Sequence, residues 1–447
     1  MLNNGQIASS HFSKANLASA VHARLCPHSG LFSLAALLLL LLGSGFPASA
    51  QSPPKNSCLD CHATLDPPLR VLPEEFSQDI HAQKGLNCSA CHGGDPSNDD
   101  MTVAMSPAAH FRGKIERRQI PELCAGCHSD NSYMRQFNPS LRTDQLAQYK
   151  TSVHGKRLEH GDTKVAVCTD CHGLHNLRPA TDTRSRVHPL NVAQTCARCH
   201  ADAEYMKEYK IPTDQYASYT SSVHHEAIAL RGDLSAPTCT TCHGNHGAAP
   251  PGVSSIEFVC STCHVFQAQL FDASPHKNTF AAMSLPACVT CHSNHRILHP
   301  SDAMIGTDHA SVCLRCHSSG DPGFEAAAAI HSQLDKLRLA IENSNGVLLR
   351  AEDSGMEVSQ AKLEADRARD ALTKARVTVH SFSVAPVAAD VDTGLKVSDQ
   401  VMQAGLAALA ERNYRRKGLA VSVLAIFVVL AGLWLLIREI ESGPGKS

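Results

Sequence analysis

The feature that most constrains this chain is a five-residue pattern that occurs nine times. Every copy reads C-x-x-C-H, and the copies begin at residues 58, 88, 124, 168, 196, 239, 260, 288 and 313. Zinc ribbons, redox dithiols and disulfides also use cysteine pairs, but none requires a histidine directly after each pair. The pattern therefore predicts covalent attachment of c-type haem at all nine copies.

In such a site two thiols bind the vinyl groups of one haem, and the histidine binds the iron. The predicted attachment residues are Cys58, Cys61, Cys88, Cys91, Cys124, Cys127, Cys168, Cys171, Cys196, Cys199, Cys239, Cys242, Cys260, Cys263, Cys288, Cys291, Cys313 and Cys316. The predicted iron ligands from the same motifs are His62, His92, His128, His172, His200, His243, His264, His292 and His317. We expect nine haem c groups.

A low-spin haem needs a second ligand, and other histidines are the candidates. One group follows a motif at once, in CHGLH, CHGNH and CHSNH, and a second group precedes a motif in TSVH, SSVH and ASPH. These are His175, His246 and His295, then His154, His224 and His276; His81, His110 and His331 complete a predicted set of nine. For the ninth place His380 and His309 stay open as alternatives to His331.

The two groups of histidines belong to an internal repeat. The spacer YMRQFNPSLRTDQLAQYKTSVH at 133 aligns with YMKEYKIPTDQYASYTSSVH at 205, so the chain holds about three copies of a two-haem module. Within TCTTCHGNHGAAP, His246 follows His243 too closely to reach the opposite face of the same porphyrin. We therefore expect His246 to bind a neighbouring haem.

Nine such motifs, with histidines enough for both iron faces, resemble the multihaem c-type cytochromes of the bis-histidine class, which serve anaerobic and nitrogen-cycle respiration. The resemblance covers residues 55 to 332. It implies a mostly α and irregular fold with a haem-filled core, which agrees with the roughly 30 residues available per haem. Relatives that act as reductases have an open haem or a lysine in the motif. All nine motifs here end in histidine, so we expect an electron carrier without substrate chemistry of its own.

The two ends of the chain carry apolar runs. Residues 1–50, with LFSLAALLLLLL and a small-residue site at 48–50, are typical of a cleaved signal peptide. Residues 419–437 are uncharged and long enough for one transmembrane helix, and residues 438–447 would form a short tail. We therefore expect the cytochrome domain, residues 51–323, on the periplasmic face of the cytoplasmic membrane. The four basic residues at 412–417 lie on the exported side, against the usual charge bias.

Residues 324–418 contain no cysteine and are rich in alanine. Apolar positions from Ile330 to Leu348 and from Ala361 to Val379 recur at helical spacing, which predicts an antiparallel hairpin followed by a third helix that enters the membrane. This segment would be a stalk or, alternatively, a docking surface for a membrane partner.

Taken together, the sequence predicts a membrane-anchored periplasmic nonahaem cytochrome. It would relay electrons between a quinol-oxidising or cytochrome b type membrane complex and a periplasmic acceptor or terminal reductase. The alternative is a reductase with one open haem that acts on a small nitrogen or sulfur oxyanion. A formal net charge of -2 argues against a nucleic-acid partner.

Overall fold

The computed structural model describes residues 55–250, 252–253, 255–443 and 445. Over these residues the chain forms helices and irregular segments and no β-strand. The predicted mostly α and irregular fold, with one long apolar helix near its C-terminal end, is confirmed. The predicted signal peptide at 1–50 lies outside the described residues.

Short helices carry the nine motifs. They are α2 (Ser57–His62), α5 (Cys88–His92), α7 (Ile120–His128), α11 (Cys168–His172), α12 (Pro189–His200), α16 (Cys239–His243), η4 (Ile256–Thr262), α19 (Val289–His292) and η6 (Cys313–Arg315). In most of them the helix ends at or next to the motif histidine, so the ring lies at the end of a rigid turn. Polar caps favour this arrangement: Asn56 and Asn87 each accept a hydrogen bond from a backbone N–H of the first turn.

The second, fourth, sixth and eighth motifs end differently from the others. The residue after the histidine has a positive φ in each: Gly93 (68°), Gly173 (94°), Gly244 (78°) and Ser293 (64°). A side chain at Gly93 would overlap the carbonyl group of His110, so this turn also requires close backbone contact. The chain leaves these four motifs abruptly, which carries the next histidine away from its own motif.

A second set of helices places a histidine at its second position. These are α4 (Ile80–Gln83), α10 (Val153–Glu159), α15 (Val223–Arg231) and α18 (Pro275–Ala282). The serine of each S-x-H sequence is the N-cap: Ser152 and Ser222 accept backbone N–H groups, and Asp79 has the same role ahead of His81. All these caps are buried, which explains why the repeat keeps a small polar residue there.

The remaining short elements connect the motif helices. They are α3 (Pro73–Phe76), α6 (Met101–Ala104), η1 (Pro107–Ala109), η2 (Arg117–Gln119), α8 (Asn131–Met134), α9 (Gln145–Thr151), α13 (Ala203–Met206), η3 (Lys207–Tyr209), α14 (Gln215–Thr220), α17 (Val265–Asp272) and η5 (Asp302–Met304). Side-chain packing among them is sparse: one small cluster joins Leu158, Val165 and Val167. The polypeptide supplies little core of its own before residue 322.

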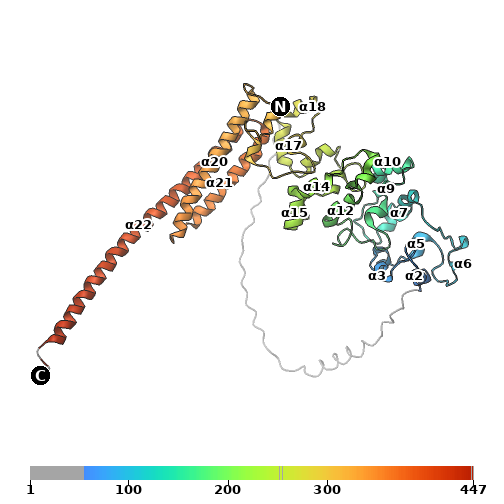
Figure 1. The fold of residues 1–447 in the computed structure, drawn as a ribbon, viewed down its shortest axis with the longest axis horizontal. Coiled ribbons are helices and arrows are strands. Elements are labelled where there is room, and N and C mark those ends of the chain that lie inside the picture. Colours follow the sequence, from blue (N-terminus) through green and yellow to red (C-terminus); the bar gives the residue numbers. More distant parts are fainter. Residues whose placement is uncertain (1–54, 251, 254, 444, 446–447) are drawn as a thin grey trace, which may run out of the picture. The chain divides into compact units, whose positions relative to one another are not determined.

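Three long helices form a bundle after the last motif (Figure 1): α20 (Pro322–Asp353), α21 (Ser359–Thr378) and α22 (Val384–Ser442), with the short η7 (Val379–Ser381) between the last two. Asp321 caps α20 and is followed by a proline at the first helical position. Leu334 and Leu337 are buried against Ala368, Val387 and other small or branched residues. The apolar stripes read from the sequence are the faces that pack here.

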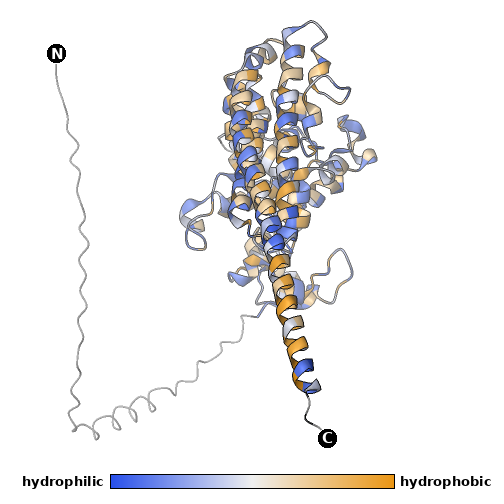
Figure 2. Cartoon of the chain, turned by 90° about the vertical axis from the view of Figure 1, so that its left-hand side faces the viewer, coloured by the Kyte–Doolittle hydropathy of each residue, from blue (hydrophilic) through white to orange (hydrophobic). Residues whose placement is uncertain are grey.

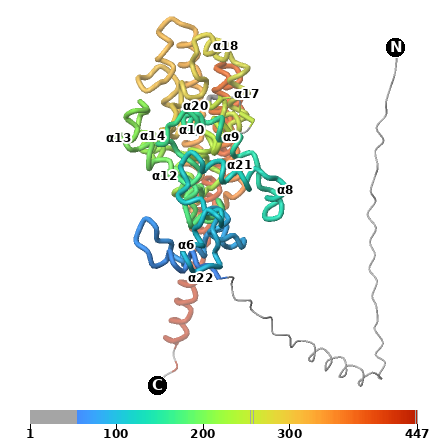
Figure 3. The backbone as a smooth tube through the Cα atoms, turned by 90° about the vertical axis from the view of Figure 1, so that its right-hand side faces the viewer, coloured from blue at the N-terminus to red at the C-terminus, as the bar shows by residue number. Residues whose placement is uncertain are grey.

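Helix α22 continues past the bundle as one unbroken helix of 59 residues. Its last part is strongly apolar and exposed (Figure 2), and it is long and apolar enough to cross a membrane. The bundle and the cytochrome region meet where α17 packs against α21 and η7, just before the beginning of α22. Figure 3 shows α17 and α18 together at the upper end of the molecule. There Arg376 of α21 forms a two-point ion pair with Asp302, at 2.8 and 2.7 Å, and Phe271 of α17 contacts Phe382.

Candidate functional site: paired imidazoles beside the motifs

Eight of the nine motif histidines face a second histidine. The distances between ring centroids range from 5.9 to 6.4 Å. The pairs, with the motif residue first, are His92–His175, His128–His81, His172–His246, His200–His154, His243–His295, His264–His224, His292–His380 and His317–His276. Each pair joins two segments that are distant in the sequence.

The separation within these pairs fits an iron atom between the rings. An imidazole nitrogen binds a transition metal at about 2.0 Å and lies about 1.1 Å from its ring centroid, so two rings on opposite faces stand about 6.2 Å apart. The residues therefore fit bis-histidine haem, with covalent attachment through the adjacent cysteines, all of which are free thiols in the described residues.

Pairing follows the repeat in two alternating ways. The even-numbered motifs take their second histidine from further along the chain, and three of these come from the C-x-x-C-H-x-x-H sequences. The odd-numbered motifs from the third onward take theirs from an earlier helix with a polar N-cap. His246 illustrates the first way: its ring faces His172 at 6.1 Å with the planes 9° apart, while His243 faces His295. The two histidines of TCTTCHGNHGAAP thus belong to different sites.

The second histidine of the eighth motif is His380, which the sequence offers as an alternative to His331. The His292 and His380 rings are 6.0 Å apart, and Nδ1 of His380 is 2.8 Å from the carbonyl oxygen of Val377. His331 lies on α20 and faces no motif histidine among the described residues. Its Nδ1 is 3.1 Å from the carbonyl of Asp302 and its Nε2 is 3.4 Å from a carboxylate oxygen of Asp335, so both nitrogens already have partners.

The first motif differs from the other eight. His62 is half-buried, and its Nδ1 donates to the carbonyl of Leu69 at 2.8 Å, which leaves Nε2 free for a metal. Within residues 55–443 as described, no second imidazole faces it. His110, a predicted second ligand, is exposed in the left-handed region (φ 57°) and has no histidine ring opposite it in this part of the chain. His188 is a buried N-cap, and its Nδ1 accepts a hydrogen bond from the backbone N–H of Leu190.

Burial keeps most of the paired imidazoles in the form that binds a metal. Desolvation, and then the neighbouring His246, lower the pKa of His172; desolvation and His295 do the same for His243. The pKa of His154 is lowered by burial and by His200. A neutral imidazole has the lone pair that iron requires, so the fold favours ligation near neutral pH.

Consecutive motifs are neighbours in space along the whole series. The thiols of Cys124 and Cys168 lie close enough to shift each other's pKa, and the same holds for Cys196 with Cys239 and Cys260 with Cys288. The pKa of a thiol in five further motifs is raised by burial and by a cysteine of the next motif: Cys58 by Cys88, Cys91 by Cys124, Cys171 by Cys199, Cys242 by Cys260 and Cys291 by Cys313. Every motif therefore adjoins the next one.

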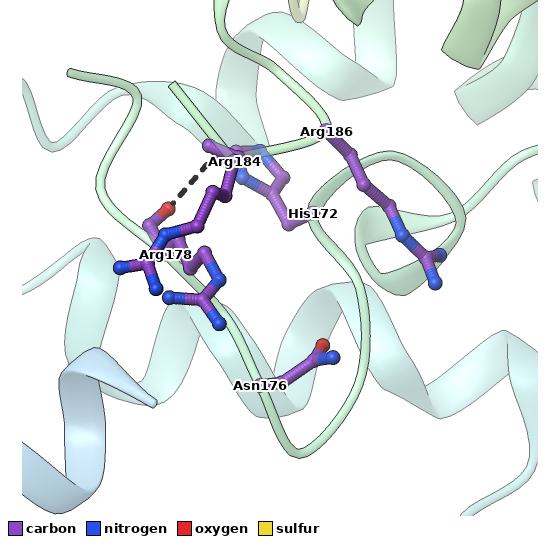
Figure 4. A pocket seen from close by; sticks show the side chains of 6 residues that line it. His172, Asn176, Arg178, Arg184 and Arg186 are labelled. Carbon is purple, nitrogen blue, oxygen red and sulfur yellow. Dashed lines mark hydrogen bonds between the residues drawn. The ribbon is translucent and has the colours of Figure 1, made fainter. Parts of the chain in front are cut away.

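Three arginines gather beside the fourth motif (Figure 4). Arg178, Arg184 and Arg186 line a small pocket together with His172 and Asn176. Arg178 and Arg184 both pair with Asp182, at 3.5 and 2.8 Å. The backbone at Gly173 lies close to Arg186, and an added Cβ there would be 3.8 Å from its Nε. Guanidinium groups at this place would suit the carboxylates of a bound haem and would favour its reduced state.

A helical fold with repeated haem-attachment motifs and facing imidazoles is typical of electron-transfer proteins that contain haem c. A family model described as Cytochrome c3 matches residues 80–189. The C-type polyheme cytochrome OmcC of Geobacter sulfurreducens is 24% identical over 133 residues, which are 29% of this chain and 16% of that relative. No solved structure gives a significant match. These matches, together with the nine motifs, make the chain similar to the multihaem c-type cytochromes.

Proposed function

We propose that the chain is an exported nonahaem cytochrome c, anchored by its C-terminal helix, that relays electrons between a membrane oxidoreductase and a periplasmic acceptor in anaerobic-type respiration. The observation that carries the proposal is the unbroken series of adjacent motifs with eight pairs of facing imidazoles. Irons with two histidines have no free position for a substrate and exchange electrons instead.

The residues of the chain position each haem and exclude competing chemistry. With haem bound, the cysteine pair would hold the porphyrin edge, the motif helix would orient the first imidazole, and a capped or sharply turned segment distant in the sequence would bring the second imidazole. Haem c supplies one-electron redox chemistry when it is bound. For eight of the nine motifs the second imidazole comes from a segment distant in the sequence, so the folding of these segments would fix the spacing between neighbouring haems.

The haem content tests the proposal directly. The full chain, produced with a c-type maturation system, is expected to retain nine haems under denaturing conditions and to be reduced and reoxidised reversibly. A matched variant, Cys239→Ser with Cys242→Ser, is expected to retain eight. A lower number in the parent chain, or haem that denaturation releases, would contradict the proposal.

The membrane side of the proposal rests on α22, whose last part is long and apolar enough to cross a membrane. A quinol-oxidising or cytochrome b type complex is the proposed donor, and a periplasmic carrier or terminal reductase is the proposed acceptor. In liposomes that contain the full chain and a reduced quinol, we expect haem reduction only after a membrane oxidoreductase is added. Protease added outside intact spheroplasts should degrade the haem region; complete protection would reverse the proposed orientation.

A second function is favoured by one observation, the unpaired His62 in the described residues. An iron with a free face could reduce a small nitrogen or sulfur oxyanion. The purified protein would then oxidise a reduced dye in the presence of nitrite or sulfite, whereas a pure carrier would not.

A further inference from the structure

We infer that the first haem, held by Cys58, Cys61 and His62, has one iron face without a ligand from the mature chain, and that this face binds small neutral molecules of the size of carbon monoxide or nitric oxide. The inference rests on the proposed function, because it requires a haem at the first motif. It gives one end of the electron-transfer series a binding site.

The pairing rule of the repeat explains why this motif differs. For the odd-numbered motifs the second histidine precedes the motif histidine by 40 to 47 positions, as the pairs His224–His264 and His81–His128 show. The same interval before His62 falls at residues 15–22. The sequence has a histidine there, His22, but it precedes the predicted cleavage site at 48–50. Cleavage of the signal peptide would remove the repeat's own ligand.

The His62 ring is oriented so that its Nε2 can bind a metal. The hydrogen bond from its Nδ1 to the carbonyl of Leu69 fixes the ring and its tautomer, as is usual for histidines that bind metals. Helix α2 is held in place by Ser57, whose hydroxyl group donates to the carbonyls of Pro96 at 2.9 Å and Asn98 at 2.6 Å. Exposed residues surround the motif, including Cys61, so a small ligand can reach this region.

The charge of the surroundings selects the class of ligand. Residues 57–76 carry four carboxylates and one arginine, namely Asp60, Asp66, Glu74, Glu75 and Arg70. The loop at 95–100 packs on Ser57 and carries three further aspartates, Asp95, Asp99 and Asp100, and no basic residue. This field opposes the approach of anions such as nitrite and sulfite. Neutral ligands meet no such barrier.

Carbon monoxide titration of the dithionite-reduced, purified holoprotein tests the inference. We expect one carbon monoxide per chain, together with a high-spin ferric signal from one haem before reduction. The variant His110→Ala should still bind one, and His246→Ala, which opens the fourth haem, should bind two. No binding to the parent chain, or binding that appears only in His110→Ala, would overturn the inference.

A separate experiment tests whether cleavage of the signal peptide removes a ligand of the first haem. N-terminal sequencing of the mature protein should begin after the predicted cleavage site, and His22→Ala should leave the carbon monoxide stoichiometry at one. If His22 stays in the mature chain and its replacement raises the stoichiometry from zero to one, the inference fails. The count of nine haems and their reversible reduction would be unaffected, so this failure is distinct from failure of the proposed function.

The charge argument is checked by sulfite binding to the oxidised protein at two ionic strengths. Salt shortens the range of the acidic field, so sulfite should bind more tightly at 0.5 M than at 0.05 M ionic strength, while carbon monoxide binding to the reduced protein should not change. Equal sulfite affinity at both would contradict the assignment to neutral ligands.

Discussion

The rings of His292 and His380 lie 6.0 Å apart with an angle of 19° between their planes, although one belongs to the eighth motif and the other to the bundle. The helical region therefore places a histidine beside the eighth motif, which favours a role beyond that of a stalk. We expect His380→Ala to convert one low-spin haem to high spin and to raise carbon monoxide binding by one per chain, without loss of helix by circular dichroism. His331→Ala is the matched control on α20 and should leave the spectrum unchanged. The reverse pattern would assign the ligand to His331.

His246 should bind the iron of the fourth motif. A crystal or cryo-electron microscopy structure of the holoprotein is expected to place its Nε2 about 2.0 Å from the iron that His172 binds. His175 and His295 should be found in the corresponding places on the second and sixth haems. A bond from His246 to the iron of its own motif would contradict the pairing described above.

The arginines beside the fourth motif should influence its potential. Replacing Arg186 with methionine removes a positive charge near this haem, and positive charge favours the reduced state. We expect one of the haems to become harder to reduce by several tens of millivolts, about the effect of one unit charge at 10 Å in a protein interior. Arg350→Met, at an exposed place on α20, is the control in spectroelectrochemical titration. Equal titration curves for both variants would exclude the arginine effect.

The bundle depends on the buried stripe of α20. Leu337 is fully buried and contacts α22 near Gly394, where an added Cβ would lie 2.7 Å from a methyl group of Leu337. We expect Leu337→Ala to lower the free energy of unfolding of the bundle by about 2–5 kcal/mol because it leaves a cavity. Leu339, two residues away and 48% exposed, is the control. Chemical denaturation followed by circular dichroism measures both, and an equal loss would show that the stripe does not form the core.

Asp79 should make the stability of the cytochrome region depend on pH. Burial raises the pKa of this carboxyl group, but hydrogen bonds from His81 and from the backbone N–H of Leu177 outweigh it, so the pKa lies below its usual 3.8. The stabilisation is therefore present at neutral pH and disappears as the pH falls through the lowered pKa. Asp79→Asn should cost about 1–3 kcal/mol at pH 7.

The difference between Asp79→Asn and the parent chain should shrink below about pH 3.8. Thermal unfolding across a pH series provides the measurement, with the exposed Asp353→Asn as the control. A difference that stays constant from pH 7 to pH 3 would show that the charge of Asp79 does not matter.

Much of this organisation could be predicted from the sequence, because covalent haem attachment requires a fixed local pattern. The apolar stripe of α20 and the apolar end of α22 were also readable, since helical periodicity and length are local properties. Which histidine meets which motif is not local. His380 lies outside the repeat, and only the packing of η7 against the cytochrome region brings it to His292. His331 matches the repeat in spacing, but its neighbours Asp302 and Asp335 occupy its nitrogens.

Because α22 is continuous, it sets the distance between the apolar segment and the end of the bundle near His380. From Val384, close to His380, to Gly418, just before the apolar segment, the helix has 35 residues without a break, or about 52 Å along its axis. If the apolar segment spans the membrane as proposed, a donor dissolved in the lipid would have no short path along this helix to a haem at the eighth motif. Electrons that enter there would then come from a partner that projects well beyond the membrane surface, or from an earlier haem. The length of α22 between the membrane segment and the eighth motif would therefore limit which partners can exchange electrons with the eighth haem.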